Sequence, residues 1–88
     1  MSSYHKKFVE TINIMFELIE RASTTDKRPI FINHVLSKTE MVLEGMKQKL
    51  QMNEEQQLLL QTVEWKFTVF KAELYLDYIS FLQNDTSV

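Results

Sequence analysis

Residues 53–83 decide the fold, and they read NEEQQLLLQTVEWKFTVFKAELYLDYISFLQ. Asn53 is a typical N-cap residue, and Gln56 stands three residues later, at the second position of a capping box. Neither Gly nor Pro interrupts the stretch, so nothing in it stops a helix. The sequence therefore predicts one long helix over about 53–83, and the polar residues 84–88 predict a frayed tail.

The predicted long helix carries apolar side chains on two opposite sides. At about 100° per residue, one set falls on a single line with the spacing of a helix-packing seam. This first stripe consists of Leu60, Val63, Phe67, Phe70, Leu74, Tyr78 and Phe81. The second stripe, centred roughly 160–180° from the first, consists of Leu58, Trp65, Val69, Ala72, Leu76 and Ile79. A helix of this kind needs apolar neighbours on both sides.

Two shorter helices are predicted upstream, over about 3–22 and about 29–50, and each has one dominant apolar face. On the first helix this face consists of Tyr4, Phe8, Val9, Ile12, Met15, Phe16 and Ile19. On the second helix it consists of Phe31, Ile32, Val35, Leu36, Val42, Leu43, Met46 and Leu50, with Thr39 in a gap. The polar residues 23–28 break the pattern between them, and Pro29 is tolerated only in the first turn of the next helix.

Composition restricts the fold class to helices. The chain of 88 residues contains one Gly, one Pro and no Cys, which leaves too few turn residues for an all-β domain and no thiol for a disulfide. Its length fits a single domain, residues 1–88. We therefore predict an all-α fold, an antiparallel three-helix bundle with a long C-terminal helix that is completed by dimerisation. No uncharged stretch is long enough to span a bilayer and no signal-peptide pattern opens the chain, so the expected location is cytoplasmic.

The second stripe has two interpretations. In one, each upstream helix covers one stripe and the three helices form a flat layer. In the other, the second stripe and the protruding end of the long helix form an interface. About 30 residues of helix span roughly 45 Å and the other two helices only roughly 30–33 Å, so the end of the long helix extends beyond them. Its apolar residues would then be exposed, which on a monomer marks a binding site or an aggregation risk. A second copy of the chain is the most economical occupant, since a two-fold axis lets the stripe meet itself, and a different protein is the next.

The interface interpretation assigns seven partner-binding residues. They are Trp65, Val69, Ala72, Tyr75, Leu76, Tyr78 and Ile79. Trp65, Tyr75 and Tyr78 are the expected anchors, because Trp and Tyr are enriched among the residues that dominate binding energy.

The chain offers little for catalysis or for binding of cofactors and metals. His5 and His34 are isolated in the sequence and are expected to be solvated, and neither lies in the Glu-x-x-His motif of helical di-metal sites. A single Gly excludes a glycine-rich phosphate loop. We therefore predict no catalytic residue, no cofactor and no metal.

The charge pattern does not favour direct binding to nucleic acid. Lys and Arg number 10 and Asp and Glu 12, which gives a net charge of −2, and Glu40 and Glu44 on the second helix would repel phosphates. The predicted function is a non-enzymatic protein-binding module, a small regulator, adaptor or inhibitor that acts through an apolar face of the C-terminal helix. The alternatives are a nucleic-acid-associated dimeric regulator, and a structural subunit or chaperone of a larger helical assembly.

Overall fold

The computed structural model describes residues 3–49 and 51–86, and it contains three α-helices. α1 spans Ser3–Thr24, α2 spans Pro29–Lys49 and α3 spans Glu54–Thr86. The residues that the structure describes form no strand, so the predicted all-helical class is confirmed. Leu50, which was assigned to the apolar face of the second helix, lies outside the described residues, as do Ser87 and Val88 of the predicted tail.

Local side-chain chemistry accounts for the helix boundaries. α1 continues to Thr24, two residues past its predicted end at residue 22. The Thr24 hydroxyl donates a hydrogen bond of 2.7 Å to the carbonyl oxygen of Glu20, and this bond allows Thr24 to remain in the helix. Pro29 opens α2, where its missing N–H costs nothing. α3 runs three residues beyond the predicted end at Gln83, since no Gly or Pro stops it there.

The predicted capping box at the start of α3 is present. The Asn53 side-chain oxygen accepts a 2.8 Å hydrogen bond from the backbone N–H of Gln56. In return, the Gln56 side-chain oxygen accepts a 3.2 Å bond from the backbone N–H of Asn53. These two bonds satisfy backbone donors that a helix end otherwise leaves unpaired, and they fix the first residue of α3.

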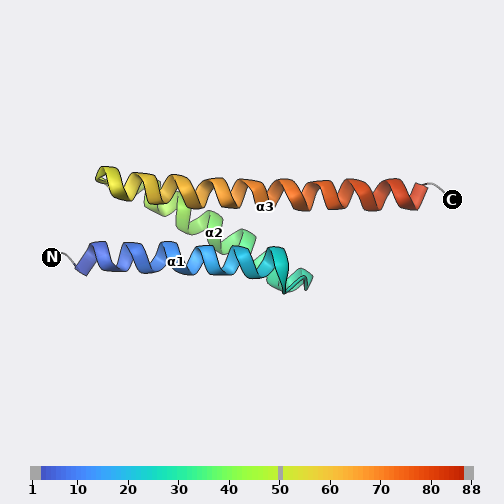
Figure 1. Cartoon of the computed structure of the whole chain (residues 1–88), viewed down its shortest axis with the longest axis horizontal. Helices are drawn as coiled ribbons and strands as arrows, with labels where there is room; N and C mark the ends of the chain where they lie inside the picture. Colours follow the sequence, from blue (N-terminus) through green and yellow to red (C-terminus); the bar gives the residue numbers. More distant parts are fainter. Residues whose placement is uncertain (1–2, 50, 87–88) are drawn as a thin grey trace.

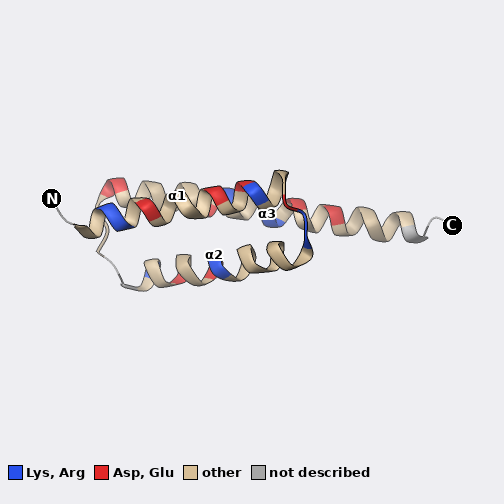
Figure 2. Ribbon diagram, turned by 90° about the horizontal axis from the view of Figure 1, so that it is seen from below, with Lys and Arg blue, Asp and Glu red and all other residues tan. Residues whose placement is uncertain are grey.

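The three helices form an elongated molecule of 61 × 19 × 17 Å. In Figure 1 the chain passes along α1, returns along α2 and passes again along α3, and both α1 and α2 lie on the same side of α3. α3 has 33 residues, against 22 in α1 and 21 in α2. Because of this difference, α3 extends well beyond the connection between the other two helices, as Figures 1 and 2 both show.

The core lies between α1 and the first half of α3, with α2 along its edge. Its buried apolar members are Phe8, Ile12, Met15, Ile19, Ala22, Val35, Leu43, Leu60, Val63, Phe67 and Phe70. On α1 the predicted face is the buried one, although Tyr4 at its start is exposed. On α2 most of the predicted face is only half-buried, because α2 packs less closely on α3 than α1 does.

The first stripe of α3 is buried only where the other helices reach it. Val63 has no exposed surface and Phe70 is 3% exposed, whereas Phe81 is 67% exposed. Leu74 is half-buried and marks the end of the core along α3. Burial of the stripe therefore stops near residue 74, and α3 continues without cover from α1 or α2.

Candidate functional site

The outward face of α3 is the most unusual surface of the molecule. Six of the seven predicted partner-binding residues are exposed, and Ile79 is half-buried; the exposed ones are Trp65, Val69, Ala72, Tyr75, Leu76 and Tyr78. Trp65 is 69% exposed and Leu76 is 64% exposed. The flat-layer interpretation is therefore wrong, because neither α1 nor α2 covers the second stripe. The interface role of these residues stays a prediction.

Charged residues on the flanks of α3 help to hold the other two helices on the first-stripe side. On one flank, the Lys66 Nζ lies 2.7 Å from a carboxylate oxygen of Glu20 on α1 and 5.9 Å from the ring centre of Phe16. On the other flank, Glu64 forms an ion pair with Lys47 of α2. Because the first stripe is buried against α1 and α2 up to about residue 74, the second stripe on the opposite side of α3 points away from the bundle.

The free end of α3 forms an apolar projection, which we call the overhang (residues 75–84). It exposes Tyr75, Leu76, Tyr78, Phe81 and Leu82. The sequence pattern places Phe81 in the first stripe rather than in the interface. Only the excess length of the predicted helix indicated that Phe81 would lie beyond the ends of α1 and α2. Isolated exposed hydrophobic residues are ordinary on a protein surface, but a contiguous group of this kind marks an interaction site or an aggregation risk.

The overhang also carries a negative charge, that of Asp77. After Lys71 the sequence contains Glu73, Asp77 and Asp85 and no Lys, Arg or His. Figure 2 shows both positive and negative residues along the ribbon of the bundle, and no positive residue on the projecting end of α3. The overhang therefore combines an apolar surface with one negative charge and no positive one.

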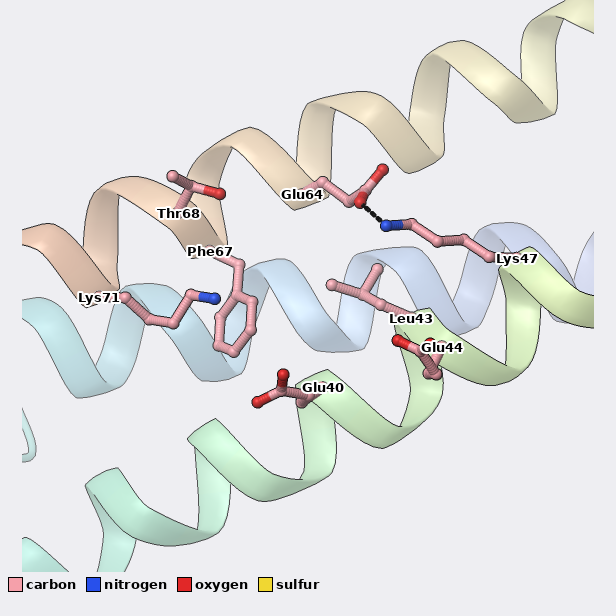
Figure 3. A pocket seen from close by; sticks show the side chains of 8 residues that line it. All are labelled: Glu40, Leu43, Glu44, Lys47, Glu64, Phe67, Thr68 and Lys71. Carbon is pink, nitrogen blue, oxygen red and sulfur yellow. Dashed lines mark ion pairs between the residues drawn. The ribbon is translucent and has the colours of Figure 1, made fainter.

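A second candidate site is the polar groove between α2 and α3 that Figure 3 shows. Glu40 and Glu44 extend into it from α2, and the Lys71 Nζ lies 4.6 Å from the ring centre of Phe67. The nearby Glu64 carboxylate accepts a hydrogen bond from Lys47 and so raises the pKa of that lysine. The groove encloses about 100 Å³, well below the roughly 300–1,000 Å³ of typical small-molecule sites, so it better fits a set of charges joining the two helices.

One polar contact was not predicted from the sequence. The Nδ1 atom of His5 lies 3.1 Å from the Nε2 atom of Gln56, which links the first turn of α1 to the capping box of α3. His5 is half-buried, so it is less solvated than predicted, whereas His34 is exposed as expected. The contact joins residues far apart in the sequence, and no local pattern could have revealed it.

Neither a metal-binding cluster nor a membrane-spanning helix is found among the described residues. Among residues 3–49 and 51–86, no group of three or more His, Asp or Glu side chains is placed to hold a metal ion. Over the same residues, none of the three helices is apolar enough along its length to cross a bilayer.

The chain matches no protein-family model, no curated protein and no solved structure. Its function has to be inferred from the exposed face of α3.

Proposed function

We propose that the chain is a non-enzymatic protein-binding module, a small regulator, adaptor or inhibitor that uses the outward apolar face of α3. The observation that carries this proposal is the exposure of the second stripe beside a core that is already closed. Val63 and Trp65 are two residues apart on the same helix, yet Val63 is completely buried and Trp65 is 69% exposed. Exposing a large aromatic side chain on a folded helix gains nothing for the isolated chain, whereas covering it with a partner buries apolar surface.

In this proposal the folding unit is an antiparallel three-helix bundle that works in the cytoplasm, and its long helix is completed by dimerisation or by another protein. The lack of cysteine fits such a location, since the chain needs no disulfide. A purely structural subunit is less well supported. A subunit of that kind folds only with its partner, whereas α1, α2 and the first half of α3 already enclose a shared core.

The rival function in nucleic-acid binding is disfavoured by the surroundings of the basic residues. The side chains of Lys47 and Lys66 each pair with a carboxylate of the same chain. Arg28 is likewise paired with Asp26 at 2.5 Å. Cations that are already neutralised gain less from phosphates, so we expect no duplex binding at about 50 mM salt, where electrostatic attraction is strong.

The test compares the intact chain with a variant that removes the face and leaves the core unchanged. The variant carries Trp65→Ala, Val69→Ala and Leu76→Ala, and Phe67→Ala is the matched core change, expected to cost about 3–5 kcal/mol. We expect the triple variant to keep its helix content and unfolding midpoint when measured by circular dichroism at a concentration where the chain is monomeric. When immobilised, the triple variant should fail to retain proteins that the immobilised wild-type chain retains from an extract of its host. These proteins can include an untagged copy of the chain itself. Unfolding of the triple variant, or identical retention by both chains, would contradict the proposal.

A further inference from the structure

The exposed face of α3 continues as a regular seam over residues 58–83. Successive positions on it are spaced alternately by four and three residues, and they are Leu58, Thr62, Trp65, Val69, Ala72, Leu76, Ile79 and Gln83. All are exposed except Ile79, which is half-buried. Alternation of four and three over this length is the heptad repeat of a coiled coil. The first stripe packs inside the chain up to about residue 74, and the seam repeats independently on the opposite side of α3.

We propose that the seam binds a second copy of this chain, with the two α3 helices antiparallel and a two-fold axis between Phe70 and Lys71. This inference rests on the proposed function and adds the occupant and its register. In this register Trp65 faces Leu76 of the second copy and Val69 faces its Ala72. The ends of the seam pair Leu58 with Gln83 in the same way.

Side-chain volumes favour the antiparallel register over a parallel one. A parallel pair would place Trp65 against Trp65 and Ala72 against Ala72, which makes one crowded layer and one hollow layer. The antiparallel pair places the large Trp65 against the medium-sized Leu76, and Val69 against the small Ala72. Since cores are close-packed and tolerate neither voids nor excess volume, the antiparallel arrangement fills every layer near the axis more evenly.

Charge complementarity supports the same register. Lys66 and Glu73 both lie next to the seam on the flank that faces α1, and they share a groove with Glu20, Ser23 and Thr24 of that helix. The antiparallel register places Lys66 of each copy beside Glu73 of the other, so the two-fold axis creates two ion pairs. Within the described part of the chain Glu73 forms none of the ion pairs, whereas Lys66 already contacts Glu20.

The register also accounts for the length of α3. Because the axis lies near residue 70, residues 58–66 of the second copy lie along residues 75–83 of the first. The bundled half of one α3 therefore covers the overhang of the other on its seam side, over a contact of roughly 38 Å. Tyr78 and Phe81 lie on the opposite side of the overhang and stay uncovered, so the second copy does not use the whole apolar surface.

The test is a charge exchange between copies, followed by sedimentation equilibrium. Glu73→Lys alone and Lys66→Glu alone each place two like-charge pairs in their homodimers, and each should weaken dimerisation about tenfold. An equimolar mixture of the two variants restores both pairs in the heterodimer and should return to wild-type affinity. Asp77→Lys makes the same charge change away from the seam and should leave dimerisation unaltered. A mixture no tighter than its components would overturn the register.

Cross-linking tests the direction of the helices independently. The chain has no native cysteine, so Leu58→Cys and Gln83→Cys introduce single, exposed thiols. In the antiparallel register the two variants should cross-link only when mixed under oxidising conditions, because two thiols at position 58 would be separated by roughly 38 Å along the helix axis. Rapid cross-linking of each variant with itself would refute this and indicate a parallel pair.

Failure of this inference can be separated from failure of the proposed function. A wild-type chain that stays monomeric up to about 1 mM excludes the second copy as the occupant. If Trp65, Val69 and Leu76 are nevertheless needed to retain another protein, the protein-binding function stands and its partner is a different chain.

Discussion

Thr39 offers a direct test of how the bundle is stabilised, through the single change Thr39→Val. The residue lies in the middle of α2 and has no exposed surface, and its hydroxyl has no hydrogen-bond partner within the described residues. Burying an unpaired hydroxyl costs about 1–3 kcal/mol. Valine has nearly the same shape and a similar helix propensity, so the change removes this cost and adds an apolar contact.

We expect the Thr39→Val change to raise the free energy of unfolding by about 1–2 kcal/mol. For a domain of 60–100 residues, each kcal/mol raises Tm by about 4–8 °C. Urea unfolding followed by circular dichroism gives the difference directly, and an unchanged m-value shows that the same surface is exposed on unfolding. Protein concentration must be equal in all samples because association adds to apparent stability.

Thr39→Ser is the matched control for this measurement. It keeps the hydroxyl and removes only a methyl group, and it should lower the unfolding free energy by about 1 kcal/mol. A valine variant less stable than the wild type would refute the reasoning, because it would show that the hydroxyl has a partner in solution.

Three further predictions concern helix propensity, a helix end and a loop. A Cβ added at Gly45 meets no atom within 4 Å, so Gly45→Ala should raise the unfolding free energy by about 0.5–1 kcal/mol in urea titration; a loss of stability would show that the position is crowded in solution. Asn53→Ala should lower the unfolding free energy by about 1 kcal/mol, whereas Asn53→Ser should retain most of the stabilisation that the N-cap gives to α3. Equal losses of stability in the two variants would argue against the cap. The Arg28 guanidinium donates hydrogen bonds to Asp26 and lowers the pKa of that carboxyl. Because the folded-state pKa is lowered, the stabilisation is complete above the ordinary carboxyl pKa and is lost as the pH falls through the lowered value. NMR titration should show the lowered pKa of Asp26 returning toward its ordinary value in Arg28→Ala, and identical titrations of both proteins would contradict this.

Periodicity predicted which side of each helix is apolar, because the helical repeat is a local property of the chain. It placed Phe8, Ile12 and Ile19 on the buried side of α1, and the capping pair of Asn53 and Gln56 at the start of α3. These features depend on residues within one or two turns of each other. Sequence alone is sufficient for them.

Periodicity could not predict how far one helix covers another. Tyr78 and Phe81 continue the pattern of Val63 and Phe70, yet they are exposed because α1 and α2 end before reaching them. The contact of His5 with the start of α3 likewise depends on how the folded helices lie side by side. Such features arise from tertiary packing, which the linear pattern only constrains.

The partial cover of α3 gives one continuous helix two local stabilities. Near its start, the capping box and the contact from His5 protect the backbone, and the side chains around Val63 are buried. Beyond residue 74 the backbone hydrogen bonds are shielded by neither α1 nor α2, so this end should open without unfolding the rest. Amide hydrogen exchange would then report a gradient of protection that falls toward the C-terminal turns, and a bound partner would flatten it.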